Sequence, residues 1–313
     1  MNEQAKSVAT APTAMTRLLR ASLASQGGWL PFDRFMALAL YAPGLGYYSA
    51  GSQQIGRMPH GGSDFVTAPE ISACFGQALA NSVREALQHT HTHTVYEFGA
   101  GNGTLALQLL DALGDAVHHY TIVDVSGSLR ERQAQTLQAH AAKVQWLEQL
   151  PASFEGVVVG NEVLDAMPVR LLHRVGGRWH ERGVVWDEVA QSLAWQDRPT
   201  DDEPPLAIEG SHDYLTETHP QADAFVRSVG ERMLSGAMFL IDYGFPEHEY
   251  YHPQRHMGTV MCHQGHLSDA DPLTQVGHKD ITAHVNFTGV ALAAQEVGLQ
   301  VLGYTSQAHF LLN

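Results

Sequence analysis

A glycine-rich run between a predicted strand and a predicted helix constrains the fold of this 313-residue chain more than any other feature. The run reads EFGAGNGT (97–104) and follows the short apolar stretch 94–98. Glycines let the backbone turn tightly and approach a ligand closely. A helix that begins at such a turn offers N–H groups that its own backbone does not use. We therefore expect a ligand-binding turn after the first strand of a parallel sheet.

Strand and helix patterns alternate through the centre of the chain. Short apolar runs predict strands, and apolar residues at helical spacing predict the helices between them. The predicted strands are 94–98, 120–125, 144–147, 156–160 and 237–242, and the helices between the first three are 103–113 and 129–141. This order is typical of a mostly parallel sheet with right-handed crossovers. The predicted fold class is therefore α/β: a Rossmann-like sheet with an N-terminal helical segment and insertions after strands four and five.

The regions before and after these predicted strands give weaker indications of secondary structure. Residues 1–90 are expected to form a helical and lid region, and residues 91–313 the Rossmann-like domain. Two adjacent glycines, Gly176 and Gly177, predict a β-hairpin insertion near 169–186. In the first region we predict helices at 15–25, at 32–41 and from Pro69, with a loop at 42–64. In the second we predict a surface loop at 197–205, helices at 214–234 and 288–297, a long loop at 245–280 and a terminal hairpin of 299–304 with 309–312.

The net charge and composition of the chain indicate which classes of molecule it is expected to bind. The formal net charge is −15 and the basic residues do not cluster, so a nucleic-acid partner is not expected. An acidic surface suits a cationic partner, such as an Arg- or Lys-bearing protein. No run of eighteen apolar residues occurs and the N-terminus has no targeting pattern, so we expect a cytoplasmic protein without membrane insertion. Its 19 histidines show no ligand spacing, and no metal site is expected.

Acidic residues stand on both sides of the glycine turn. Glu97 closes the first predicted strand, and Asp124, with Val125, closes the second, where an acid meets ribose hydroxyls in this architecture. The spacing E-x-G-x-G-x-G differs from the dinucleotide pattern G-x-G-x-x-G and resembles motif I of class I methyltransferases. In that motif the first acid helps position the methionine part of S-adenosylmethionine. We expect this cofactor, with a dinucleotide site and a purely structural turn as alternatives. The expected contacts from these segments are Glu97, Gly99, Gly101, Gly103, Asp124 and Val125.

Eight segments spread over nearly the whole chain match one known family in order. They are APGLGYY (42–48), GSDFVTAPEISACFG (62–76), EFGAGNGTL (97–105), YTIVDVSGSLRERQ (120–133), GNEVLDAMPVR (160–170), FLIDYG (239–244), YYHPQRHMGTV (250–260) and DITAHVNFT (280–288). The chain thus resembles the MidA family of S-adenosylmethionine-dependent methyltransferases. The resemblance implies that Thr67, Pro69 and Glu70 line the site. It also suggests a protein partner, since mitochondrial members act as complex I assembly factors that methylate an arginine of a complex I subunit.

The chain departs from the family pattern at three places. Asp124 stands where members usually carry Glu, which shortens the reach to the ribose but keeps the chemistry. Asn286 stands where they usually carry Asp, so no acidic role is expected there. Members typically run on beyond the segment that matches 310–313.

Candidate catalytic residues follow the fourth and fifth predicted strands. Glu162 and Asp165 are three residues apart and would share one face of a helical turn. We expect both to contact the substrate nitrogen, with Asn161 nearer the cofactor. The alternative is that Asn161 caps a short helix whose first turn favours the two acids. Asp242 and His284 are further candidates, each with a purely structural hydrogen bond as its alternative.

The function predicted from these residues is methyl transfer to an arginine nitrogen of a partner protein. A guanidinium is always charged and carries five donors, so carboxylates beside the cofactor would orient it and take up the proton that it loses. A subunit of respiratory complex I is one such partner. The alternatives are a small-molecule methyltransferase and a non-catalytic assembly module that retains the fold. The oligomeric state is not predicted.

Overall fold

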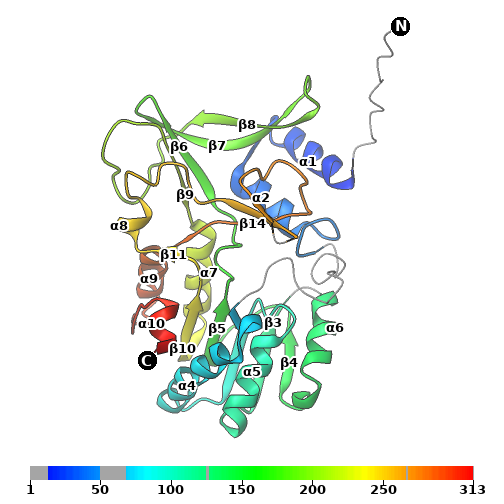
Figure 1. Cartoon of the computed structure of the whole chain (residues 1–313), viewed down its shortest axis with the longest axis vertical. Coiled ribbons are helices and arrows are strands. Elements are labelled where there is room, and N and C mark those ends of the chain that lie inside the picture. Colours follow the sequence, from blue (N-terminus) through cyan, green and yellow to red (C-terminus); the bar gives the residue numbers. More distant parts are fainter. Residues whose placement is uncertain (1–12, 50–67, 125–126, 266, 313) are drawn as a thin grey trace.

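A five-stranded parallel sheet forms the lower part of the molecule in Figure 1. The computed structural model describes residues 13–49, 68–124, 127–265 and 267–312. The order of the sheet is β10-β5-β2-β3-β4, and every neighbouring pair runs parallel. The bounds are β2 (Thr94–Phe98), β3 (His119–Val123), β4 (Val144–Leu147), β5 (Phe154–Asn161) and β10 (Met233–Ile241). The predicted α/β class with a Rossmann-like sheet is confirmed.

Helices cover both faces of this sheet, because alternate residues of each strand point to opposite sides. Val95 and Val157 pack with α4 (Ala73–Thr90) and α5 (Thr104–Leu113). Tyr96 and Val158 pack on the other side with α7 (Pro220–Gly230). The remaining helices around the sheet are α6 (Gly127–Thr136), α9 (Phe287–Glu296), which packs against α7, and α10 (Gln307–Leu312). A parallel sheet buried on both faces leaves the carboxyl ends of its strands as the natural place for a ligand.

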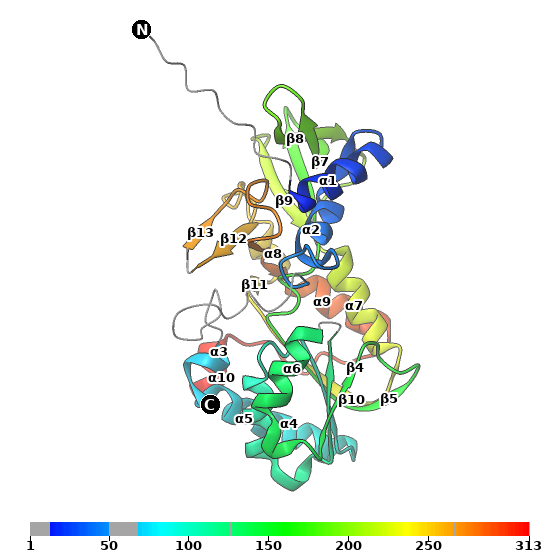
Figure 2. The ribbon, with the colours of Figure 1, turned by 90° about the vertical axis from the view of Figure 1, so that its right-hand side faces the viewer.

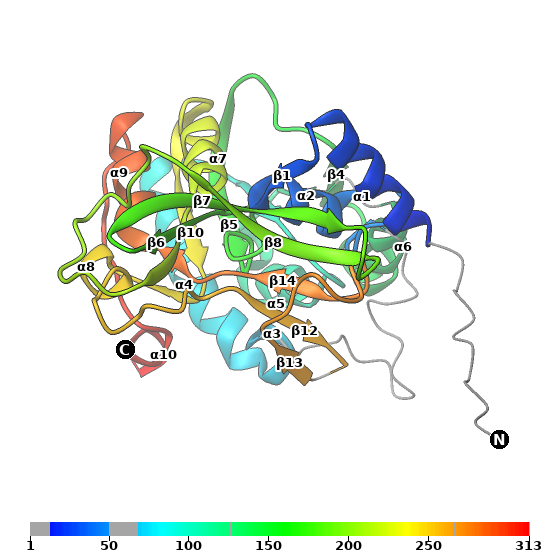
Figure 3. The same cartoon turned by 90° about the horizontal axis from the view of Figure 1, so that it is seen from above.

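A twisted antiparallel sheet forms the upper part of the molecule (Figures 1 and 3). Its strands are β1 (Trp29–Pro31), β6 (Arg170–Val175), β7 (Arg178–Asp187), β8 (Ser192–Pro199) and β9 (Tyr214–Thr218), in the order β1-β7-β6-β9 with β8 beside β7. Helices α1 (Ala14–Ser25) and α2 (Phe32–Tyr41) share a core with it. The predicted hairpin is confirmed: Gly176 and Gly177 form its turn at φ 55° and 78°, which suits a two-residue turn of type I′.

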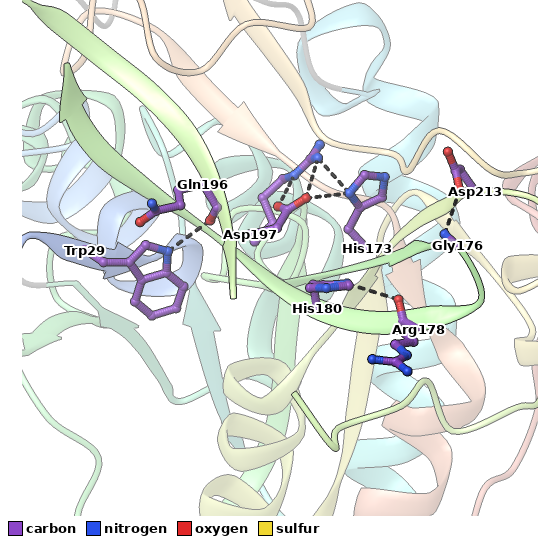
Figure 4. A network of polar contacts seen from close by, with 9 residues as sticks. Trp29, His173, Gly176, Arg178, His180, Gln196, Asp197 and Asp213 are labelled. Carbon is purple, nitrogen blue, oxygen red and sulfur yellow. Dashed lines mark hydrogen bonds and ion pairs between the residues drawn. The ribbon is translucent and has the colours of Figure 1, made fainter. Parts of the chain in front are cut away.

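Polar contacts across three strands hold this antiparallel sheet together (Figure 4). Arg182 Nε donates to Asp197 Oδ1 at 2.8 Å, and His173 Nδ1 lies 2.6 Å from the other oxygen of the same carboxylate. Burial raises the pKa of Asp197, but the hydrogen bonds from His173 and Arg182 outweigh it and hold that pKa well below its usual range. Trp29 Nε1 donates to the Gln196 carbonyl at 2.9 Å and ties the N-terminal segment to β8.

The predicted long loop at 245–280 is wrong in part, since about a third of its residues form short helices and strands. It contains α8 (Glu247–Tyr250), β12 (Met261–Gln264) and β13 (Leu267–Asp269) (Figure 2). Strand β12 also pairs with β14 (Asp280–Thr282). The segment is anchored by the buried Glu217 of β9. That carboxylate accepts the Thr259 N–H at 2.7 Å, the Val260 N–H at 3.2 Å and the Tyr250 hydroxyl at 2.9 Å. Short polar strands of this kind depend on distant partners, which periodicity does not reveal.

Two other assignments are wrong in part, and a third is wrong throughout. The predicted helix at 214–234 begins as β9, because Tyr214 and Thr216 are buried in the antiparallel sheet, and α7 starts only at Pro220. The predicted surface loop at 197–205 loses its first residues to β8, which ends at Pro199. The predicted terminal hairpin is absent from the described residues, where 299–306 has no regular structure and 307–312 is α10.

The division of the chain at residue 90 does not match the packing. Helix α4 lies before that boundary yet belongs to the core of the parallel sheet. Helices α1 and α2 instead pack on strands from the region after residue 168, and β1 pairs directly with β7. No helix among the described residues is both long and apolar enough to cross a lipid bilayer.

Candidate functional site

The glycine turn after β2 is an open cradle. Gly99, Gly101 and Gly103 have φ values of 64°, 53° and 88°, which side chains disfavour. A Cβ at Gly99 would lie 2.8 Å from Val163 Cγ2, whereas a Cβ at Gly101 would meet nothing within 4 Å. Gly103 is the N-cap of α5, so the first N–H groups of that helix begin beside the turn. The cradle fits a nucleoside ligand that approaches the backbone at Gly101.

A buried glutamine joins the two halves of this cradle. Gln133 of α6 donates through Nε2 to the Gly101 carbonyl at 3.0 Å and to Asp124 Oδ2 at 3.1 Å. Its own oxygen accepts from Trp146 Nε1 at 2.9 Å, and its side chain is fully buried. The glycine turn and the acid expected at the ribose are thereby held in one arrangement. The sequence did not single out Gln133, because a polar residue in a predicted helix carries no signal until its partners are placed.

Glu97 lies inside the sheet rather than at its rim. It is buried, and its Oε2 accepts the Tyr120 hydroxyl of β3 at 2.6 Å. Burial raises the pKa of Glu97 to about 7, although the hydrogen bond from Tyr120 lowers it. A buried carboxylate of this kind is stabilised by a cationic group, and the expected contact with the methionine ammonium stays a prediction.

The segment before α4 is tied to the glycine turn. Asn102 Nδ2 donates to Glu70 Oε1 of α3 (Ala68–Ile71) at 2.8 Å, while Asn102 Oδ1 accepts the Thr104 N–H at 3.0 Å. The Pro69 carbonyl accepts from Gln108 Nε2 at 2.7 Å. Of the residues expected to line the site from this side, Pro69 and Glu70 therefore lie beside the cradle. Thr67, and Val125 after β3, lie outside the described residues.

A tight turn without a helix follows β5. Asp242, directly after β10, accepts the Leu164 N–H at 2.8 Å and the Asp165 N–H at 3.3 Å. The expected helical turn is therefore wrong, and so is the alternative in which Asn161 caps a helix. Glu162 adopts φ +52°, a conformation that costs energy for a residue with a Cβ and that gathers at functional sites. The carboxylate of Asp242 orders the turn, a role that appears only when the two strands are neighbours.

The carboxylates at this edge repel one another. Burial raises the pKa of Asp165 well above its usual value, and Asp242, Asp280 and Glu162 raise it further. Burial and Asp242 raise the pKa of Glu162 to about 7, although hydrogen bonds from Asn161 and the Ala68 N–H lower it. Burial raises the pKa of Asp242 to about 6 against its backbone hydrogen bonds.

Glu162, Asp165 and Asp242 are called the acidic cluster. None of the three has a cationic partner among the described residues, because the ion pairs formed there all involve other acids. The Asn161 side-chain oxygen is buried beside the cluster and accepts no hydrogen bond from the described residues. Buried carboxylates at such close quarters are costly unless a positive charge joins them. The acidic cluster is thus suited to a cationic guest that also donates hydrogen bonds.

His284 lies apart from the acidic cluster in its contacts. Its ring packs edge-on against Phe245 at 5.2 Å, its N–H donates to Thr259, and its carbonyl faces His219 Nε2 at 2.8 Å. Burial and the positive charge of Arg255 lower its pKa. Both hydrogen bonds are made by the backbone of His284, whereas its ring Nδ1 is buried and has no hydrogen-bond partner among the described residues. A catalytic role for the ring therefore stays a prediction. Asn286 has a clear structural role, since its Oδ1 caps α9 by accepting the Thr288 N–H at 3.1 Å.

Two tyrosines reach the same edge from the N-terminal segment. The Tyr41 hydroxyl donates to the Ala166 carbonyl at 2.8 Å, and the Tyr48 hydroxyl donates to Asp280 Oδ1 at 2.9 Å. Neither residue was predicted to have a functional role. The only signal was the place of Tyr48 in the family-like segment 42–48, because a loop and a helix end do not reveal which strand they will meet.

Comparisons with known proteins agree with this geometry. Residues 75–305 match the model of the family described as "Putative S-adenosyl-L-methionine-dependent methyltransferase". A protein from Burkholderia thailandensis described as a "likely methyl transferase", whose crystal structure is bound to S-adenosyl-homocysteine, is 52% identical. It superposes with a TM-score of 0.89 over 96% of this chain and 80% of that one.

Relatives of known name are also methyltransferases. A protein named "Protein arginine methyltransferase NDUFAF7 homolog, mitochondrial" from Drosophila melanogaster is 27% identical over 95% of this chain and 74% of its own length. The Homo sapiens protein of that type is 27% identical over 96% of this chain and 73% of its own length. Because the family model spans most of the chain and the cradle fits its cofactor, this chain belongs to the MidA-like family of S-adenosyl-L-methionine-dependent methyltransferases.

Proposed function

We propose that this chain transfers a methyl group to an arginine nitrogen of a partner protein. The observation that carries the proposal is the acidic cluster, which stands at the carboxyl edge of the parallel sheet beside the glycine cradle and has no cation among the described residues. A guanidinium supplies both the missing positive charge and several N–H donors in one plane.

The residues of the site would have different roles in the transfer: some bind the cofactor, some orient the acceptor and one accepts a proton. When bound, the cofactor supplies a methyl group on a positively charged sulfur. Glu97, the glycine turn and Asp124 would hold it, and Asp165 and Asp242 would orient the acceptor so that its nitrogen faces that methyl group. As the new N–CH₃ bond forms and the S–CH₃ bond breaks, the nitrogen loses a proton. Glu162, whose pKa is raised to about 7, is placed to accept it at neutral pH.

The names of the curated relatives support an arginine acceptor, because both describe protein arginine methyltransferases. The family resemblance extends the proposal to a respiratory complex I subunit as the partner. A cytoplasmic location stays a prediction from the sequence, and the two relatives are named as mitochondrial proteins.

Methylarginine in the host proteome tests the proposal. Protein from cells that lack the gene, complemented with the wild type or with Glu162→Gln, is digested and its methylated peptides are quantified by mass spectrometry. We expect at least one methylarginine that the wild type restores and Glu162→Gln does not, while calorimetry finds unchanged affinity of the variant for S-adenosylhomocysteine. A methylated small molecule that depends on the gene, with no change in methylarginine, would establish the small-molecule alternative instead.

A further inference from the structure

Two stacked tyrosines stand beside the acidic cluster. Tyr41 is the last residue of α2, and the chain then folds back so that the Tyr48 N–H donates to the Leu40 carbonyl at 2.9 Å. The rings of Tyr41 and Tyr48 lie 5.6 Å apart between centroids with 19° between their planes. Tyr48 in turn packs edge-on against the buried ring of Tyr47 at 5.1 Å. The Tyr41 ring is therefore supported from behind by a rigid aromatic layer.

Hydrogen bonds fix this layer to both sides of the site. The Tyr41 hydroxyl is bound to the carbonyl of Ala166, the residue that follows Asp165 of the cluster. The Tyr48 hydroxyl is bound to Asp280, and the Ala283 N–H donates to the Asp165 carbonyl at 2.9 Å. Each ring is fixed by its backbone at one end and by its hydroxyl hydrogen bond at the other. The two side chains therefore lose little conformational entropy when a ligand binds.

Tyr41 nevertheless keeps an exposed surface. Tyr41 as a whole residue is 40% exposed, although its hydroxyl is engaged and one face of its ring meets Tyr48, so part of this residue stays accessible to a ligand. Burial raises the pKa of its hydroxyl, and the carboxylates of Asp280 and Asp165 raise it further, so the phenol stays neutral and has those acids nearby. An accessible aromatic residue next to the carboxylate of Asp165, which has no cationic partner among the described residues, is an arrangement that attracts a flat cation.

We propose that the ring face of Tyr41 opposite Tyr48 is the surface on which the acceptor guanidinium stacks, while Asp165 engages its N–H groups from the side. This inference rests on the proposed arginine acceptor. A guanidinium is planar and weakly hydrated, so it can stack on a ring and donate in its own plane at the same time. A lysine ammonium is compact and strongly hydrated and gains less from such a surface. Tyr41 would thus be a specificity-determining residue that favours arginine over lysine.

Fluorination of the ring provides a test that leaves its size nearly unchanged. Phenylalanine and its mono-, di- and trifluorinated forms are placed at position 41 by stop-codon suppression. Initial rates are measured with a pool of arginine-centred peptides and a matched lysine-centred pool. We expect Tyr41→Phe to stay within about 3-fold of the wild type and KM for the arginine pool to rise stepwise with fluorine, by about 10-fold in total. The dissociation constant for S-adenosylhomocysteine should not change.

Removal of the ring gives the larger effect and has a matched control. Tyr41→Leu should raise KM for the arginine pool by about 5- to 30-fold. Tyr304→Leu should leave it unchanged, because Tyr304 is also an exposed tyrosine packed against an aromatic ring, Phe287 at 5.3 Å and 50° between planes, and makes no polar or ring contact with the cluster among the described residues. The fluorinated series decides the question even where Tyr41→Leu fails to fold.

The possible outcomes distinguish a failure of the stacking role of Tyr41 from a failure of the proposed arginine acceptor. A wild type that methylates the arginine pool, with a KM that stays flat across the fluorinated series, overturns the stacking role alone. Equal methylation of both pools by the wild type overturns the specificity. A wild type that methylates neither pool overturns the inference together with its arginine acceptor.

Discussion

Glu162 carries both strain and charge at a single position. Its φ of +52° costs energy in any residue with a Cβ, and Asp242 disfavours its ionised form. Its carboxylate is nevertheless kept in contact with Asn161 and the Ala68 N–H. Strain at a residue that also has a shifted pKa is characteristic of functional sites, where stability is given up for chemistry.

The strain at Glu162 can be measured by comparing two substitutions that both remove the carboxylate. Glu162→Gly should unfold with a free energy about 1 kcal/mol higher than Glu162→Ala, because glycine adopts positive φ without a steric cost. The matched control is Glu85, an exposed residue inside α4, where the order should reverse because alanine favours a helix. Denaturant titration measures both pairs. Equal stability of the two position-162 variants would show that no strain is stored there.

Gln133 should matter for cofactor affinity. Gln133→Leu removes the hydrogen bonds to Gly101 and Asp124, one of them to a carboxylate, so the dissociation constant for S-adenosylhomocysteine should rise about tenfold. Gln145→Leu is the control, since its amide bonds to Thr121 Oγ1 on the neighbouring strand and touches neither half of the cradle. Isothermal titration calorimetry compares the two. If both variants bind equally well, Gln133 does not organise the cradle.

At the scale of elements, apolar runs and glycine turns could be predicted from the sequence, and polar pairings could not. The bounds of β2 and β4 were predicted to the residue, because buried runs carry their own signal. The hairpin at Gly176 and Gly177 was predicted because few residues adopt positive φ twice in succession. Strand β9 was missed, because TET (216–218) suits a strand only when β6 lies beside it. The tyrosines of the site were missed for the same reason: their partners are more than a hundred residues away.

The junction between β9 and α7 should make stability depend on pH. His219 is buried there, and burial lowers its pKa to about 4 although its contact with the His284 carbonyl raises it. The folded protein keeps this ring neutral, so its contribution is complete above pH 6.5 and is lost as pH falls toward 4. The shift from 6.5 to about 4 corresponds to about 3.5 kcal/mol at 1.4 kcal/mol per pKa unit, of which about 3 kcal/mol is lost between pH 7 and pH 4.

The effect of His219 must be separated from acids that act in the opposite direction. Glu97 and Glu162, each with a pKa raised to about 7, destabilise the folded state as pH rises. We therefore compare the wild type with His219→Gln by urea unfolding at several pH values. Their difference in unfolding free energy should change in favour of the variant by about 3 kcal/mol between pH 7 and pH 4. A difference that is constant over this range would contradict a neutral buried His219.

At the scale of the whole molecule, the site is built where two sheets meet. The parallel sheet supplies the cradle and the acidic cluster from the carboxyl ends of β2, β3, β5 and β10. The N-terminal segment, which packs on the antiparallel sheet, supplies Tyr41 and Tyr48. Figures 1 and 2 show the antiparallel sheet beyond the carboxyl ends of the parallel strands. We therefore expect cofactor and acceptor to be bound by different parts of the chain.

The pH dependence of methyl transfer tests the central claim most directly. With radiolabelled S-adenosylmethionine and protein from gene-deleted cells, the label recovered as methylarginine is measured from pH 5 to pH 9. If Glu162 accepts the proton, the wild-type rate should rise about tenfold per pH unit below 7 and level off above it, and Glu162→Gln should be slow and independent of pH over this range. A wild-type rate that does not change with pH, or label that never appears in arginine, would contradict the claim.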